Sequence, residues 1–346
     1  MKSLMYREIH EEPALLPRLE AENKKVLTAL ADRVRAEKIR SIVLAGRGTS
    51  DHAAIFGSYL LTILGNYVCT LAEPSAITLY GAMPDYSGCL VLAVSQSGCA
   101  ADALAVLLQG KRSGAVTCAI TNDPESPLAR EADYHLSCAC GTERSVAATK
   151  TFTAELGLMI LLGAYLCDKP ELAGALVRTA EPLEELFRQE ETVREAAAPF
   201  RYASGGFILS RGLGYPMALE AALKLKETCC LPFHGYASSD FYHGPLAQID
   251  PQSAVLVMAL SGHALEDLRQ MMDRLTSIGA SPLLITDDPG AAARWPRHFL
   301  LPAAPSEETA PLLLAAFLQL FACFLSEERG TSPDHPRYLS KVTVTR

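Results

Sequence analysis

The stretch Val91-Leu-Ala-Val-Ser-Gln-Ser-Gly98 decides the fold that we expect for this chain. Its apolar half, which begins one residue earlier at Leu90, is typical of a short buried strand. A turn of hydroxyl residues and glycine follows, and an amphipathic helix begins near Ala100 and Asp102. Such a unit gathers backbone N–H groups, hydroxyls and the positive end of a helix dipole. The stretch therefore predicts a site for an anion such as phosphate.

Composition narrows the class of protein. The chain has 346 residues, of which 49% are hydrophobic, and a net charge of −8 at pH 7. This length fits two domains with a large core, and the acidic balance argues against a nucleic-acid partner. The opening Met1-Lys-Ser-Leu-Met-Tyr-Arg-Glu8 lacks the apolar region of a secretory signal. We therefore expect a cytoplasmic protein with reduced thiols.

Neither the cysteines nor the apolar runs indicate a metal site or a membrane span. Cys138-Ala-Cys140 and Cys229-Cys230 lack zinc-site spacing, so we expect no metal and interpret these residues as buried thiols. The runs 156–166 and 311–325 are shorter than the roughly 18 apolar residues that a span needs. We expect both runs to form helices in the core of a globular protein.

Strands alternate with helices in the first half of the chain. Ser41-Ile-Val-Leu-Ala45 predicts a buried strand, and the glycine-rich turn Gly46-Arg-Gly-Thr-Ser50 leads into a helix. Residues 90–94 and 115–120 predict two further strands. The alternation predicts an α/β fold with a parallel sheet and helices on both faces.

The second half repeats the first. The segment 207–214 matches 43–50 at an offset of 164 residues, and 285–289 matches 120–124 at an offset of 165. Between them, 255–262 echoes the strand before Ser95. The chain is therefore predicted to be an internal duplication, with two tandem doubly wound parallel sheets, each flanked by helices in an αβα sandwich.

The predicted organisation has five parts. The N-terminal helical segment is interpreted as a packing or dimer helix, and the connector between the domains as helical and charged. In chain order the parts are the helical segment 1–40, the phosphate-binding domain 41–167, the connector 168–203, the second domain 204–330 and the tail 331–346.

The two copies differ where a ligand would bind. The first copy has hydroxyl residues at Thr49-Ser50 and Ser95-Gln-Ser-Gly98, whereas the second has Leu213-Gly214 and Ala259-Leu-Ser-Gly262. Because ligands of open α/β sheets bind at the carboxyl ends of strands, we expect one phosphate site, in the first domain.

The second copy carries charged residues that the first lacks. Ala218 to Thr228 predicts a helix on which Glu220, Lys224 and Glu227 share one face. An exposed, ion-paired stripe is one interpretation of this face. Proton transfer close to a phosphate anchor is the other.

The segment that follows favours the second interpretation. Residues 233–245 are aromatic and polar and read as a loop, in which His243-Gly-Pro245 sets an imidazole at a turn. His234 is a second candidate, although a single loop histidine is more often exposed or a hydrogen-bonding core residue.

Together these stretches resemble the SIS (sugar isomerase) family. The resemblance is closest to the isomerase half of glucosamine-6-phosphate synthase and to the SIS-type glucosamine-6-phosphate deaminases. It covers the chain from about residue 40 onward. The matching stretches are 46–53, 95–98, 146–150, 218–227, 243–245 and 336–343.

The resemblance implies roles for individual residues and no metal or organic cofactor. Glu227 would move a proton between C1 and C2 through an enediol-type intermediate, supported by Glu220 and Lys224. His243 would open the sugar ring, supplied across the interface of a homodimer, and Lys341 would close over the open-chain sugar. The implied phosphate and sugar ligands are Gly48, Thr49, Ser50, Ser95, Gln96 and Ser97, with the backbone of Ala147 and Ala148.

Departures from the relatives narrow the expected reaction. Cys99 and Ala100 stand where the synthases have Glu and Thr, Ala148 agrees with the deaminases, and Lys2 stands at the position of the glutaminase nucleophile. We expect a glucosamine 6-phosphate deaminase that needs no glutamine. A fructosamine-phosphate deglycase, another amino-sugar-phosphate isomerase and a non-catalytic phosphosugar-binding regulator are the alternatives.

Overall fold

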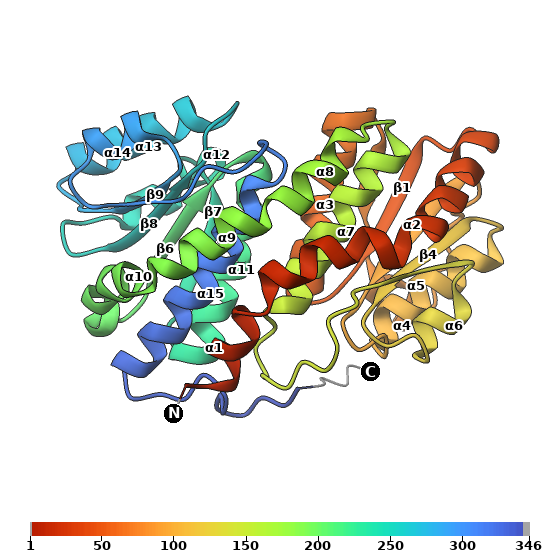
Figure 1. The fold of residues 1–346 in the computed structure, drawn as a ribbon, viewed down its shortest axis with the longest axis horizontal. Coiled ribbons are helices and arrows are strands. Elements are labelled where there is room, and N and C mark those ends of the chain that lie inside the picture. Colours follow the sequence, from red (N-terminus) through yellow and green to blue (C-terminus); the bar gives the residue numbers. More distant parts are fainter. Residues whose placement is uncertain (1, 342–346) are drawn as a thin grey trace. The chain divides into compact units, whose positions relative to one another are not determined.

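The computed structural model describes residues 2–341, which form two compact units, each around a five-stranded parallel sheet (Figure 1). The first unit comprises residues 14–143 and 150–177, and the second comprises 2–13, 144–149 and 178–341. The short segments 2–13 and 144–149 precede the rest of the second unit in the sequence but pack within that unit.

The central strands of the first sheet lie where the apolar runs predict them, within one residue at each end. They are continuous hydrophobic runs because helices cover both faces of the sheet. The sheet order is β2-β1-β3-β4-β5. Its strands are β1 (Ser41–Ala45), β2 (Val68–Leu71), β3 (Cys89–Val94), β4 (Val116–Thr121) and β5 (Tyr134–Ser137).

The second sheet repeats the topology of the first. Its order is β7-β6-β8-β9-β10, all parallel, which confirms the predicted duplication and the α/β fold class. Its strands are β6 (Gly206–Ser210), β7 (Phe233–Ala237), β8 (Ala254–Ala259), β9 (Leu283–Thr286) and β10 (His298–Leu300).

The interpretation of residues 233–245 as a loop is wrong for residues 233–241, which form β7 and the short helix α12 (Ser238–Phe241). β7 pairs with β6 from Gly206↔Phe233 to Ser210↔Ala237. Phe233 and Ala237 are buried, and a Cβ at Gly235 would lie 2.5 Å from the carbonyl oxygen of Ala218. Buried and polar residues alternate along β7, as is typical of a strand at a sheet edge. The polar residues of this pattern are also common in loops, which explains the wrong prediction.

Helices cover both faces of the first sheet (Figure 1). α3 and α7 pack closely together, since a Cβ at Gly57 would lie 2.5 Å from the sulfur of Met159. On the other face, α5 contributes Val106 and Leu107 to a core with Val91 of β3. The helices wholly or mostly in this unit are α2 (Glu12–Ala36), α3 (Thr49–Gly65), α4 (Pro74–Thr78), α5 (Ala101–Arg112), α6 (Pro127–Glu131), α7 (Lys150–Leu166) and α8 (Glu171–Arg178).

Helices also cover both faces of the second sheet, with α13 and α14 on one side and α11 and α15 on the other (Figure 1). α15 is long and apolar enough to span a membrane by composition, but 94% of that apolar window is buried in the protein, as predicted for a core helix. The helices are α1 (Leu4–Ile9), α9 (Ala180–Arg188), α10 (Glu190–Ala197), α11 (Tyr215–Cys229), α12 (Ser238–Phe241), α13 (Leu265–Ser277), α14 (Pro289–Arg294) and α15 (Ala310–Glu328), with 3₁₀ turns at Ala198–Tyr202, Gly212–Gly214 and Pro245–Gln248.

Candidate functional site

The two turns that carry the predicted phosphate ligands lie at one edge of the first sheet. β1 and β3 are neighbours in parallel register, and each turn follows the carboxyl end of its strand. β2 lies beyond β1 and β4 beyond β3, so the chain winds in opposite directions from this point. Ligands of open α/β sheets bind at such a switch point. The turns contain Gly48, Thr49, Ser50, Ser95, Gln96 and Ser97.

Backbone hydrogen bonds shape the second of these turns. The Gly98 N–H donates to the Ser95 carbonyl at 3.0 Å, and the Asn122 N–H donates to the Gln96 carbonyl at the same distance. The hydroxyl oxygen of Ser97 accepts the Cys99 N–H at 3.3 Å. The turn is thereby fixed before any ligand arrives, at the start of α5.

Gly98 has no room for a side chain. Its φ is +63°, and a Cβ there would clash with the hydroxyl of Ser126. The added methyl group should displace the turn, so we expect Gly98→Ala to weaken binding of inorganic phosphate by about tenfold or more. A tenfold loss of affinity corresponds to about 1.4 kcal/mol. Titration calorimetry measures this change.

Gly114→Ala is the matched control for that substitution. Gly114 also has a positive φ, +74°, but nothing lies within 4 Å of its would-be Cβ. Backbone strain of about 1–2 kcal/mol is common to both variants, so only Gly98→Ala should lose phosphate. Equal affinities in the two variants would show that the turn does not hold the anion.

Ser50 differs from the other predicted hydroxyl ligands. Its hydroxyl is buried and donates to Oε1 of Glu155 at 2.8 Å. A serine hydroxyl has one hydrogen, so in this arrangement the Ser50 hydroxyl is not available as a donor to a phosphate. The Ser50 hydroxyl instead connects the first turn of α3, next to Thr49, to Glu155 of α7.

An arginine–aspartate pair braces each sheet edge, and the sequence analysis missed it. Nε of Arg47 lies 2.9 Å from Oδ2 of Asp102, and Nη1 of Arg211 lies 3.3 Å from Oδ2 of Asp267. Each pair joins the turn after the first strand of its sheet to the first turn of a later helix. The shared offset of 164 to 165 residues was a readable signal.

At the second sheet edge, the protein's own carboxylates occupy the equivalent backbone amides. The Ser261 N–H donates to Oδ1 of Asp287 at 2.6 Å. The His263 N–H donates to Glu307 at 3.0 Å, and Nδ1 of His263 lies 2.8 Å from the same carboxylate. Carboxylates already accept these N–H groups, which supports the prediction of one anion site in the first domain.

The predicted charged face of α11 is buried. Nζ of Lys224 lies 3.3 Å from Oε1 of Glu220 and 2.5 Å from Oε2 of Glu227. The side chains of Lys224 and Glu220 are 1% and 3% exposed, and that of Glu227 is 20% exposed. The alternative of an exposed, ion-paired stripe is therefore wrong, because this face packs inside the protein.

The charge of this cluster follows from its geometry. Burial lowers the pKa of Lys224, but the carboxylates of Glu220 and Glu227 outweigh burial and raise its pKa above the ordinary value of 10.5. Lys224 is therefore protonated at neutral pH, and it compensates two carboxylates at once. Glu227 is the member of the cluster that a ligand can reach.

His243 lies apart from this cluster in its contacts. It follows α12 at an exposed turn, where its N–H donates to the Asp240 carbonyl at 3.0 Å and Gly244 has a φ of +136°. Within residues 2–341 its imidazole has no hydrogen-bond or ion-pair partner, and His234 on β7 is likewise exposed. A role across a homodimer interface remains a prediction.

The loop that contains Ala147 and Ala148 belongs to the second unit and is fixed at both ends. The carboxylate of Glu8 accepts the N–H groups of the residues at positions 144 and 145, and Nε2 of Gln319 donates to the Thr149 carbonyl at 3.3 Å. Lys341 is the last described residue; the tail residues 342–346 lie outside the described part.

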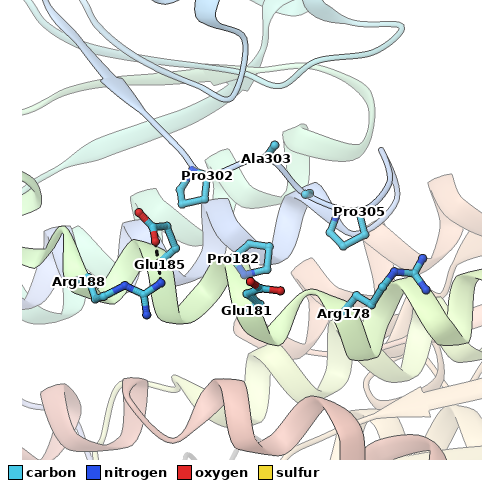
Figure 2. Close-up of a pocket in the computed structure, with 9 residues that line it drawn as sticks. Arg178, Glu181, Pro182, Glu185, Arg188, Pro302, Ala303 and Pro305 are labelled. Carbon is cyan, nitrogen blue, oxygen red and sulfur yellow. Dashed lines mark hydrogen bonds and ion pairs between the residues drawn. The ribbon is translucent and has the colours of Figure 1, made fainter.

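A surface pocket of about 480 Å³ lies elsewhere in the second unit, between α9 and the segment 302–305 (Figure 2). Arg178 and Glu181 line it, and Arg188 pairs there with Glu185 at 2.6 Å. Among the described residues, none of the predicted site residues lines this pocket. The two acidic and two basic side chains of this pocket favour neither an anionic nor a cationic ligand.

Comparison with known proteins places these features in a family. A family model described as SIS domain matches residues 37–163 and 205–325. The chain is 32% identical to the glutamine–fructose-6-phosphate aminotransferase (isomerizing) of Pyrococcus horikoshii, over 98% of this chain and 57% of that protein. It thus spans little more than half the length of the curated relatives it matches.

Solved structures share the whole fold. A protein of Silicibacter pomeroyi, provisionally described as a phosphosugar isomerase, is 30% identical, with a TM-score of 0.86 over 96% of this chain and all of that one. The C-terminal domain of glucosamine-fructose-6-phosphate aminotransferase from Francisella tularensis is 25% identical, with a TM-score of 0.82 over 97% of this chain and 98% of that one.

Proposed function

Because the chain belongs to the SIS domain family, we propose that it is an enzyme of the phosphosugar isomerase type. More specifically, we propose that it converts glucosamine 6-phosphate and water to fructose 6-phosphate and ammonia. The names of the aminotransferase relatives and of the Silicibacter pomeroyi protein support the substrate class. The deaminase-like stretch Val146-Ala-Ala-Thr-Lys150 supports the finer assignment.

The buried cluster on α11 carries this proposal. Removing three charged side chains from water costs free energy, so a buried cluster of this kind is rarely explained by stability alone. Charged groups in unusual environments are typical of catalytic sites. Within the cluster, Glu227 keeps the most exposed side chain, while Glu220 and Lys224 are almost fully enclosed. Glu227 is therefore the group we assign to proton transfer.

The proposed reaction balances without a cofactor. Glu227 takes the proton from C2 of the open-chain amino sugar and returns it to C1. The C1 oxygen gains a proton from water and the C2 nitrogen gives one up to water, so the C1 aldehyde becomes an alcohol and the C2 amine becomes an imine. Water then adds to the imine and ammonia leaves, giving the C2 ketone. Lys224 remains protonated throughout and holds the Glu227 side chain in position through their ion pair.

The remaining predicted residues bind the substrate in this proposal. The turns of the first sheet edge hold the phosphate through backbone amides and the hydroxyls of Thr49, Ser95 and Ser97. His243 of the partner subunit opens the ring in a homodimer, and Lys341 covers the open-chain sugar. Ser50 supports the anchor through Glu155.

A substrate panel tests the proposal. Purified protein is incubated with glucosamine 6-phosphate, glucose 6-phosphate, fructose 6-phosphate and a fructosamine 6-phosphate, and ammonia, fructose 6-phosphate and free amino acid are measured. We expect equal amounts of ammonia and fructose 6-phosphate from the first compound. Amino acid release from the last would identify a deglycase instead. Binding of these compounds without any turnover would identify a regulator and refute the enzymatic proposal.

A further inference from the structure

The short helix α1 contacts two of the segments that carry predicted site residues. Its last turn contains Glu8, whose buried carboxylate accepts the Arg144 N–H at 2.6 Å and the Ser145 N–H at 3.0 Å. These bonds lie two residues before Ala147 in the sequence. All of these residues belong to the second unit.

The first turn of α1 holds the C-terminal segment. The Leu4 N–H donates to Oδ2 of Asp334 at 2.7 Å, and the Met5 N–H donates to Oδ1 at 3.0 Å. Two charge-assisted bonds to one carboxylate fix the position of that residue. Asp334 lies seven residues before Lys341, and Pro336 between them is buried.

The helix itself is anchored to the body of the second unit. The Tyr6 hydroxyl donates to Oε2 of Glu190 at 2.6 Å, and Nε2 of His10 lies 3.3 Å from the same oxygen. Met5 and Ile9 of α1 are fully buried. The helix is thus a fixed support for the segments bound at its two ends.

We propose that α1 is a positioning element, in which Glu8 sets the backbone at Ala147–Ala148 and Asp334 sets the segment that carries Lys341. We name the pair of contacts made by these two carboxylates the α1 bridge. This role rests on the proposed function, and it goes beyond the interpretation of the N-terminal segment as a packing or dimer helix. Both carboxylates act through other residues and do not touch the substrate.

Glu8→Gln tests one end of the α1 bridge. Glutamine has nearly the same shape, but it keeps one acceptor oxygen and turns an NH₂ group toward the second backbone N–H. We expect faster hydrogen exchange of the Arg144 and Ser145 amides and faster cleavage by trypsin after Arg144. We also expect KM to rise about tenfold with kcat within roughly threefold, since the loosened loop binds substrate less well.

Asp334→Asn tests the other end. It should increase hydrogen exchange in residues 335–341 and lower kcat about tenfold with little change in KM, because Lys341 would act after the substrate has bound. Tyr6→Phe is the control for both, since it removes one hydrogen bond to Glu190, while the buried Met5 and Ile9 still hold α1 in place and Glu8 and Asp334 keep their bonds. It should lower Tm and leave KM and kcat unchanged.

The exchange and proteolysis measurements separate this inference from the proposed function. If the wild-type protein turns over no sugar phosphate, the proposed function fails, and exchange still reports on the α1 bridge. Unchanged exchange at Arg144 and Ser145 in Glu8→Gln would overturn the inference. The inference would also be overturned if Tyr6→Phe increased hydrogen exchange and KM as much as Glu8→Gln does.

Discussion

Replacing Glu227 with glutamine is expected to lower kcat by about 10²- to 10⁴-fold, the range that a positioned acid or base contributes. The amide cannot accept the C2 proton, yet its oxygen can still accept a hydrogen bond from Lys224, which lies 2.5 Å from the carboxylate. The fold should therefore persist, with Tm close to that of the wild type. Initial rates of ammonia release at saturating substrate measure the effect.

Glu220→Gln is the matched control. Glu220 pairs with the same lysine, at 3.3 Å, but its side chain is 3% exposed. A substrate cannot reach Glu220. Its replacement should therefore lower kcat by about tenfold at most, through a change in the position of the Lys224 side chain. If Glu227→Gln kept near-wild-type activity, or if the two variants lost activity equally, Glu227 would not be the group that moves the proton.

Replacing Lys224 with methionine is expected to cost about 3–5 kcal/mol of unfolding free energy, the loss typical of breaking a buried ion pair. Methionine fills a similar volume, but two carboxylates then face each other without the cation between them. The urea midpoint, measured by circular dichroism, reports the loss. The combined variant Glu220→Gln, Lys224→Met should recover part of it, because it removes the buried charge that lacks compensation.

The pH dependence of this loss follows from the direction of the pKa shift. The pKa of Lys224 is raised in the folded protein, so the stabilisation is complete below the unfolded-state pKa of about 10.4. It disappears only as the pH rises through the higher folded-state pKa. The difference between wild type and Lys224→Met should therefore be constant from pH 6 to pH 9, provided that Glu220 stays ionised in the variant. An unchanged urea midpoint would show that the cluster contributes no net stability.

The central strands of both sheets could be predicted from the sequence, whereas the edge strands could not. β1, β3 and β4 are continuous apolar runs because both faces are covered, and such runs are recognisable in a single sequence. β2, at the edge of its sheet, is short and mostly exposed. β7 mixes aromatic, polar and small residues, because pairing on one side only places weaker demands on its composition.

The candidate site was predictable where one helix contains it. The spacing of Glu220, Lys224 and Glu227 puts them on one face, but the same spacing fits an exposed stripe, and only tertiary packing decides between the two. The contact from Glu8 to Arg144 joins residues 136 apart. Nothing local in a sequence records such a contact, so the role of α1 could not be foreseen.

The carboxylates at the second sheet edge have a consequence for thermodynamic linkage. Asp287 and Glu307 accept their N–H bonds at any ligand concentration, so this edge behaves like a permanently liganded copy. A ligand at 100 times its Kd adds about 2.7 kcal/mol of stability to the state that binds it. Added phosphate should therefore slow hydrogen exchange at residues 95–104 and leave residues 261–268 unchanged. The second copy thus supplies its own anions at positions where, under the proposed function, the first copy takes a phosphate from solution.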